Sequence, residues 1–208
     1  MRSALARIKS KVARVAHEAP LPASRCPIRC DLRLNPPLRE SEVVAFEEKH
    51  RITLPEEYRT FLLEVGNGGM GPGEGLKTLT ESAERSPTSD LDRPFPFSFR
   101  MYQEDEGRFI DARRNEPYHQ PGVLFLAAVE DPWVSVYLVI TGEDRGLVWG
   151  CGLVEGGWNP EAPTWEGDQR AIDGPPRRFL RWYEDWLNVI LPNADGDGED
   201  KACPARPE

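Results

Sequence analysis

The sequence has few of the residues that most often hold metal ions or serve as nucleophiles. Its 208 residues include four cysteines and three histidines. Cys26, Cys30, Cys151 and Cys203 are irregularly spaced, which does not suit the disulfide framework of a secreted domain, so we expect reduced thiols. Cys26 and Cys30 with His17 supply only half of a zinc signature. We therefore predict no metal site and no cofactor.

Long apolar runs are also missing. No stretch approaches the roughly 18 apolar residues that a membrane span needs, and residues 1–20 lack the apolar region and cleavage site of a secretory signal. We expect a cytoplasmic protein that does not bind membranes. A chain of 208 residues, 39% of them hydrophobic, is long enough for one domain with a full core.

Basic stripes are absent from the body of the chain, although residues 1–20 are rich in Lys and Arg. The formal net charge is −9, and both the body and residues 192–208 are acidic. A nucleic-acid-binding protein usually displays a basic surface that neutralises phosphates, so we predict no nucleic-acid partner. The charge favours a basic protein partner. An acidic solvated surface without a partner is the common alternative.

Catalytic motifs are missing as well. The sequence contains no G-x-S-x-G elbow and no H-E-x-x-H pair, and no histidine can be assigned to activate Cys151. Two carboxylate pairs, Glu130 with Asp131 and Glu143 with Asp144, lie in turn-like segments where exposed acids are ordinary. We predict no catalytic residues. A hydrolase or transferase with an acidic cleft is the less favoured alternative.

One glycine-rich stretch does match a known spacing. Gly66, Gly68 and Gly71 fit G-x-G-x-x-G, which in dinucleotide-binding proteins follows a strand and opens a helix. Here a predicted helix precedes the glycines, so no helix N-terminus is available for a phosphate, and Glu74 would repel one. We interpret the stretch as a helix end followed by a tight turn.

Apolar spacing predicts the main elements. Helices are expected near the N-terminus and over residues 38–50, 55–65 and 177–190, and strands over 122–129, 134–140 and 147–150. The N-terminal helix either docks on the domain, which we favour, or lies on an anionic membrane. Residues 80–121 are rich in proline and charge, and we expect little regular structure there. The polar tail is expected to be disordered.

Six tryptophans fall into two groups. Trp182 and Trp186 share the apolar stripe of the last predicted helix, and Trp149 lies in a predicted strand, so these three should be core residues. The others lie in predicted loops, where a large ring either anchors a partner or packs on its own domain. They are Trp133, Trp158 and Trp165.

Together the acidic turns and one loop tryptophan give the predicted partner-binding residues. Strands should hold the neighbouring carboxylates in fixed positions, and a tryptophan can supply the desolvated contact that charge alone does not. The predicted residues are Glu130, Asp131, Trp133, Glu143 and Asp144.

Three segments resemble the SUKH superfamily, of the Smi/Knr type. The segment "NPPLRESEVVAFEEKHRITLPEEYRTFLLEVGNGGMGPGEGL" resembles its N-terminal signature, and "VYLVITGEDRGLVW" and "FLRWYEDWL" resemble a later strand–turn–strand unit and the closing helix. The resemblance implies a single α+β domain at residues 30–191, with helices packed around a mixed or antiparallel sheet. An N-terminal helix and linker at 1–29 and an acidic tail at 192–208 would flank it.

The resemblance also implies a function. Bacterial members are commonly immunity proteins that bind and occlude a toxin domain, often a nuclease or deaminase, of polymorphic or contact-dependent systems. An acidic inhibitor suits a basic nuclease. The alternative in the same class is a regulatory scaffold, like the fungal Smi/Knr-type regulators of cell-wall synthesis. The oligomeric state and the identity of the partner stay open.

Overall fold

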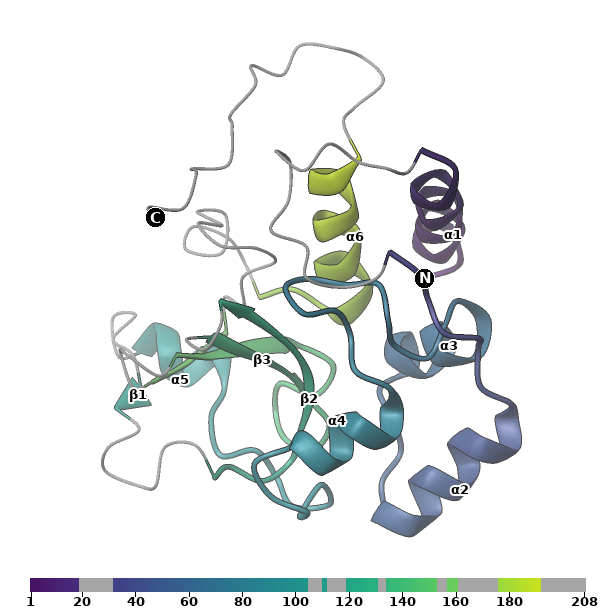
Figure 1. The fold of residues 1–208 in the computed structure, drawn as a ribbon. Coiled ribbons are helices and arrows are strands. Elements are labelled where there is room, and N and C mark those ends of the chain that lie inside the picture. Colours follow the sequence, from purple (N-terminus) through teal and green to yellow (C-terminus); the bar gives the residue numbers. More distant parts are fainter. Residues whose placement is uncertain are drawn as a thin grey trace, which may run out of the picture.

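The structure is a computed structural model that describes residues 1–18, 32–104, 110–111, 119–130, 134–152, 157–160 and 176–191. In Figure 1 most helices gather on one side of a curved antiparallel sheet, whereas α5 (Phe99–Glu104) lies beside β1 (Ile110–Asp111), and the arrangement agrees with the predicted α+β class. The helices are α1 (Arg2–Glu18), α2 (Glu40–His50), α3 (Glu56–Glu64), α4 (Leu79–Arg85), α5 (Phe99–Glu104) and α6 (Phe179–Ile190).

Within the described residues the sheet has five strands in the order β1-β5-β4-β3-β2, and each pairing is antiparallel. Its strands are β1 (Ile110–Asp111), β2 (Val123–Glu130), β3 (Val134–Val139), β4 (Val148–Gly152) and β5 (Gly157–Asn159). The three strands predicted from the sequence correspond to β2, β3 and β4. Consecutive strands from β2 to β5 pair with each other, so short connections suffice.

Both faces of the sheet are buried because apolar residues occupy successive positions along the strands. In β3, Val136 and Leu138 face the main core beneath the helices, whereas Tyr137 and Val139 face a second cluster on the opposite side. This alternation follows from the period of two in a strand. A register shift between Phe125 and Ala127 interrupts it in β2.

Helix α6 lies at the centre of the main core. Phe61 of α3 meets Phe179 and Tyr183 of α6 edge-on, with ring centroids 5.1 and 5.0 Å apart. Such T-shaped pairs are favoured by the charge distribution of aromatic rings. The predicted stripe is buried in full, as Trp182 and Trp186 are at most 1% exposed.

Helix α1 lies beside α6 (Figure 1) and docks on the domain. Leu5, Ile8 and Val15 are buried in the same core as α6. Its basic side chains also reach α6, since Arg7 and Lys11 bind Glu184. The favoured prediction for this helix is therefore confirmed.

The second cluster corrects one prediction about the tryptophans. Trp158 belongs to β5 and is 0% exposed, with its ring centroid 5.0 Å from that of Phe95 and 4.9 Å from that of Tyr137. It is not a loop residue available to a partner. Trp133 and Trp165 lie outside the described residues.

Residues 80–121 contain more regular structure than predicted, namely α5, β1 and most of α4. A sequence signal for α4 was present: Thr78 accepts a hydrogen bond from the backbone N–H of Glu81, while Glu81 accepts one from the N–H of Thr78. This is a capping box, which satisfies two free N–H groups at the start of a helix.

The glycine-rich stretch is a tight turn, as predicted. Gly68 and Gly69 have positive φ angles of 78° and 96°. The stretch then runs along the edge of β2, where Glu74 and Lys77 donate backbone hydrogen bonds to the carbonyls of Ala128 and Leu126. The stretch thereby covers part of the outer edge of β2, which is the last strand in the sheet order.

Candidate functional site

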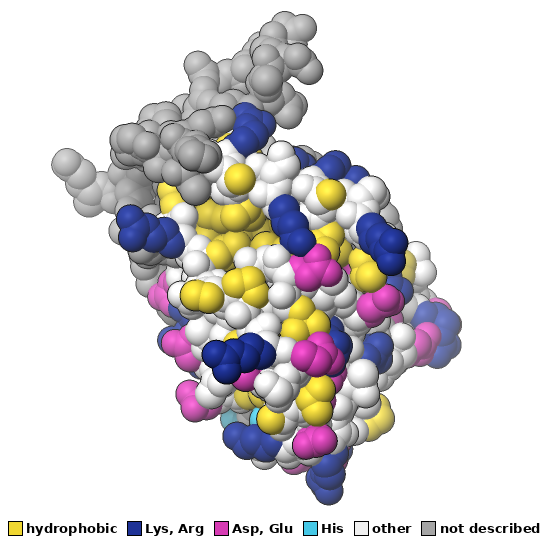
Figure 2. Space-filling model, turned by 90° about the vertical axis from the view of Figure 1, so that its right-hand side faces the viewer, with side chains coloured by type: hydrophobic (Ala, Val, Ile, Leu, Met, Phe, Trp, Pro, Cys, Tyr) yellow, Lys and Arg dark blue, Asp and Glu magenta, His cyan; other side chains and the backbone are white. Residues whose placement is uncertain are grey.

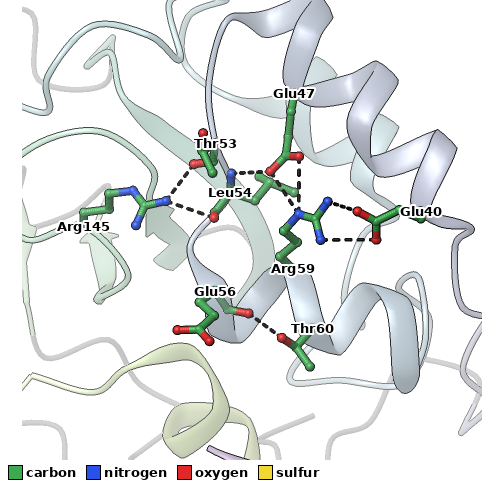
Figure 3. A network of polar contacts seen from close by, with 8 residues as sticks. All are labelled: Glu40, Glu47, Thr53, Leu54, Glu56, Arg59, Thr60 and Arg145. Atoms are coloured by element: carbon green, nitrogen blue, oxygen red, sulfur yellow. Dashed lines mark hydrogen bonds and ion pairs between the residues drawn. The ribbon is translucent and has the colours of Figure 1, made fainter.

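A network of polar contacts joins α2, α3 and the turn between β3 and β4 (Figure 3). Arg59 of α3 binds two glutamates of α2: its Nη2 contacts Oε1 of Glu40, and its Nε lies 3.3 Å from both carboxylate oxygens of Glu47. The hydrogen bonds from Arg59 lower the pKa of Glu40. These contacts fix the angle between the two helices.

The extended segment between α2 and α3 is held from two sides. Glu47 Oε1 accepts a hydrogen bond of 2.8 Å from the N–H of Leu54. From the other side, Arg145 Nη2 donates to the carbonyls of Thr53 and Leu54, each at 2.9 Å (Figure 3). The backbone groups of Leu54 are thus fully used, and the turn carrying Arg145 is tied to the start of α3.

A surface hollow of about 320 Å³ lies where this turn, the start of α3 and the start of α6 meet. Pro55 and Gly146 are buried, whereas Glu56, Arg145 and Arg178 are exposed around them. The lining residues are Met1, Pro55, Glu56, Glu57, Arg145, Gly146 and Arg178. All but Met1 lie in or next to the three segments that resemble SUKH proteins.

Sequence reasoning did not find this hollow. A signal existed in "RRFLR", because Arg177, Arg178 and Arg181 lie at the start of α6, where the helix dipole disfavours cations. Asp185 offsets the charge of two of these arginines, because its carboxylate lies 3.4 Å from Nε of Arg177 and 3.0 Å from Nε of Arg181. Arg178 has no such partner among the described residues.

Of the predicted partner-binding residues, Glu143 is exposed. Its carboxylate binds Arg100 of α5, with Nε–Oε1 and Nη2–Oε2 distances of 3.1 and 3.2 Å. These hydrogen bonds lower the pKa of Glu143, so it is ionised at neutral pH. A partner that binds Glu143 must share it with Arg100.

Asp144 is buried, contrary to the expectation of an exposed carboxylate. It is 7% exposed, and its Oδ2 accepts hydrogen bonds from the N–H of Phe99 at 2.8 Å and from Trp149 Nε1 at 3.0 Å. Burial raises the pKa of Asp144. The side chain holds α5 and Trp149 in place, so it does not belong to a contact surface.

Glu130 does not lie beside Glu143. Glu130 ends β2 and pairs with Val134, the first residue of β3, while Asp131 and Trp133 fall outside the described residues. Glu143 lies in the turn after β3, four residues beyond Val139, the last residue of that strand. Because a strand rises about 3.3 Å per residue, the six residues of β3 separate Glu130 from the turn that carries Glu143 by about 17 Å. They cannot meet in one small site.

Two groups with strongly shifted acidity, Tyr137 and Cys151, are core groups and not cleft groups. Burial raises the pKa values of Tyr137 and Cys151 to about 12 each. A catalytic residue is usually tuned in the opposite sense and faces a cleft. Within the described residues no cluster of three or more His, Cys, Asp and Glu side chains could bind a metal ion, and no helix is long and apolar enough to cross a membrane.

Charges of both signs are interspersed around apolar patches on the face that carries α1, α2 and α3 (Figure 2). The described residues include nearly equal numbers of basic and acidic side chains. The acidic excess of the whole chain, −9, therefore falls mainly in the segments outside them.

A comparison with protein families shows which family this chain belongs to. The family model of the SMI1 / KNR4 family (SUKH-1) matches residues 37–167, which is more than half of the chain. The chain belongs to this family. The SUKH-1 match includes α2 to α5 and the sheet, whereas α1 and α6 lie outside it. Comparisons with curated proteins and with solved structures gave no match.

Proposed function

We propose that this SUKH protein is an immunity protein, which binds a basic toxin domain and blocks it without catalysis. The observation that carries the proposal is the SUKH-1 match over residues 37–167. SUKH proteins are generally non-catalytic, and the bacterial members that this chain resembles commonly neutralise nucleases or deaminases. A net charge of −9 supports a basic partner, because opposite charges accelerate association.

The turn after β2 is the proposed contact surface. Glu130, Asp131 and Trp133 remain candidates there, with the carboxylates attracting the partner and the tryptophan filling a pocket on it. Glu143, at the other end of β3, is assigned to a separate and weaker contact because it already binds Arg100. Asp144 is left out because it is buried.

The test is protection. The toxin domain encoded beside this protein is expressed in cells with and without the chain, and survival is counted. Protection together with a copurifying complex supports the proposal, whereas copurification with an unrelated cellular enzyme supports a regulatory scaffold instead. Turnover of a substrate by the purified chain would reject the non-catalytic function.

Kinetics then locate the surface. Raising the salt concentration should slow association of the complex, and reversing the charges of Glu130 and Asp131 should slow it further. Trp133→Ala should mainly accelerate dissociation. Glu84→Arg is the matched control, since it reverses an exposed acid on α4. Association that is insensitive to salt, or equal effects of the control and the test variants, would reject this surface.

A further inference from the structure

Among the described residues, the hollow beside Arg145 is bordered by charged groups of both signs that form no ion pair. In the described part of the structure, only Nη2 of Arg145 forms hydrogen bonds, to the carbonyls of Thr53 and Leu54. The Arg178 guanidinium lies over Gly146, where an added Cβ would come within 3.0 Å of its Nη1. Within the described part of the chain, neither guanidinium lies within ion-pair distance of a carboxylate. Two cationic groups thus border the same small space.

Acidic groups border it from the α3 side. Glu57 already accepts a hydrogen bond of 3.1 Å from the N–H of Leu180, so its carboxylate satisfies a free N–H group in the first turn of α6. Glu56 is exposed, and its carboxylate points away from the α2 network, toward the chain that enters α6 (Figure 3). Its backbone carbonyl binds Thr60, but its carboxylate has no partner among the described residues.

Opposite charges this close on a surface usually pair with each other, yet here they stand apart around a hollow. We propose that the hollow binds a charged pair of neighbouring side chains on a peptide segment. The acidic side chain enters between Arg145 and Arg178, and the basic one binds Glu56. Arg145 is positioned for this by its bonds to the backbone, which reduces the entropy lost on binding.

Size and charge argue against other ligands. At about 320 Å³ the hollow is at the small end of ligand sites, so it fits one or two side chains and not a nucleotide. A phosphate or another simple anion would meet Glu56 and Glu57 as well as the arginines. A ligand that carries one acidic and one basic group can pair with the arginines and with Glu56 at the same time. A nucleic-acid strand, which carries only negative charge, does not.

The inference rests on the proposed function, because the segment is taken to be a loop of the toxin domain. It adds a second contact that selects the partner by a local pattern of charge, while the turn after β2 responds to its overall basicity. A wrong partner lacking the charged pair would leave the arginines and Glu56 desolvated and unpaired, which disfavours binding.

Peptide titration of the full-length chain tests the hollow without the toxin. The probes are capped tetrapeptides with a central Lys-Glu or Glu-Lys pair, compared with a capped Gly-Gln-Gln-Gly peptide, and the readout is the amide resonance of Gly146. Saturable shifts are expected for at least one charged probe and not for the neutral one. Arg178→Gln, at an exposed position, should weaken binding at least about threefold.

A charge swap provides the matched control. The double variant Glu56→Arg with Arg178→Glu keeps the net charge but exchanges the walls, and it should lose binding of the preferred probe. No saturable shift with either charged probe, or unchanged affinity in both variants, overturns the inference. Because the peptide titration needs no toxin, it can show binding to the hollow even if the chain does not protect cells from the toxin. Conversely, a protecting chain whose hollow binds no probe keeps the proposed function and loses this contact.

Discussion

Glu184 of α6 binds Arg7 of α1 through two parallel hydrogen bonds, Nε to Oε1 and Nη2 to Oε2, each 2.8 Å long. Lys11 donates to the same Oε1 at 2.7 Å. The Glu184 side chain is 6% exposed but that of Arg7 is 54% exposed, so water screens the pair in part. The bonds from Arg7, and then from Lys11, hold the pKa of Glu184 at about 2. This carboxylate fastens to the domain a helix that the family match does not include.

Acid should therefore loosen α1. The pKa of Glu184 in the folded state is below its ordinary value of 4.5, so its stabilisation is complete above about pH 4.5 and is lost as the pH falls toward 2. We expect the protection of α1 amides, measured relative to their intrinsic exchange rates, to fall between pH 5 and pH 3 more than that of amides in the sheet. Glu184→Gln should cost roughly 1–3 kcal/mol at pH 7 and flatten this dependence. Glu64→Gln is the control, because its bond to Lys9 is exposed. Equal behaviour of the two variants would contradict the prediction.

Asp144 and Glu143 are neighbours in the sequence, but replacing them by alanine should affect the stability of the fold very differently. Asp144→Ala leaves the N–H of Phe99 and the buried Nε1 of Trp149 without their acceptor, which should cost roughly 2–4 kcal/mol of unfolding free energy. Glu143→Ala removes an exposed ion pair and should leave the unfolding free energy nearly unchanged. Urea unfolding measures both. Similar small losses would show that Asp144 is not structural.

Much of the fold was predictable from the sequence, because its signals are local and repeated. Phe179, Trp182 and Trp186 recur at helical spacing, and Pro55 and Gly66 bracket α3. The short helix α4 was missed although its Thr78–Glu81 capping box was present, since proline and charge around it suggested loops. Trp158 was placed in a loop because β5 has only three residues, too few to show alternation.

The site was harder to predict because it depends on which distant residues meet. Glu143 and Asp144 are adjacent in sequence and both acidic, but the side chain of one faces Arg100 and that of the other faces Trp149. Nothing local distinguishes them. Arg145 and Arg178 line the same hollow only because the start of α6 packs beside the β3–β4 turn. A backbone hydrogen bond from Val148 to the carbonyl of Arg177 holds the two segments together.

The position of Trp158 leads to a further prediction. Trp158→Ala removes a fully buried ring that contacts Phe95 and Tyr137, and should cost roughly 3–5 kcal/mol. The loss should appear as a lower unfolding midpoint before any partner is added. If the variant folds with normal stability and only binding is lost, then Trp158 is a contact residue and its buried position in β5 is wrong.

The glycine turn protects the edge of β2, and Gly73 is its closest point of approach. Its φ angle is +57°, and a Cβ built there would lie 1.8 Å from the carbonyl oxygen of Ala128. Gly73→Ala must therefore push the turn away from the strand and break the hydrogen bond from Glu74 to Ala128, at a cost of roughly 1–3 kcal/mol. The freed edge should also pair with other chains, so light scattering should rise with concentration well below the unfolding temperature. Glu74→Ala, which removes only partly exposed contacts to Lys77 and Arg85, is the neighbouring control and should stay monodisperse. A Gly73→Ala protein that is as stable and as monodisperse as this control would show that the turn does not shield the strand.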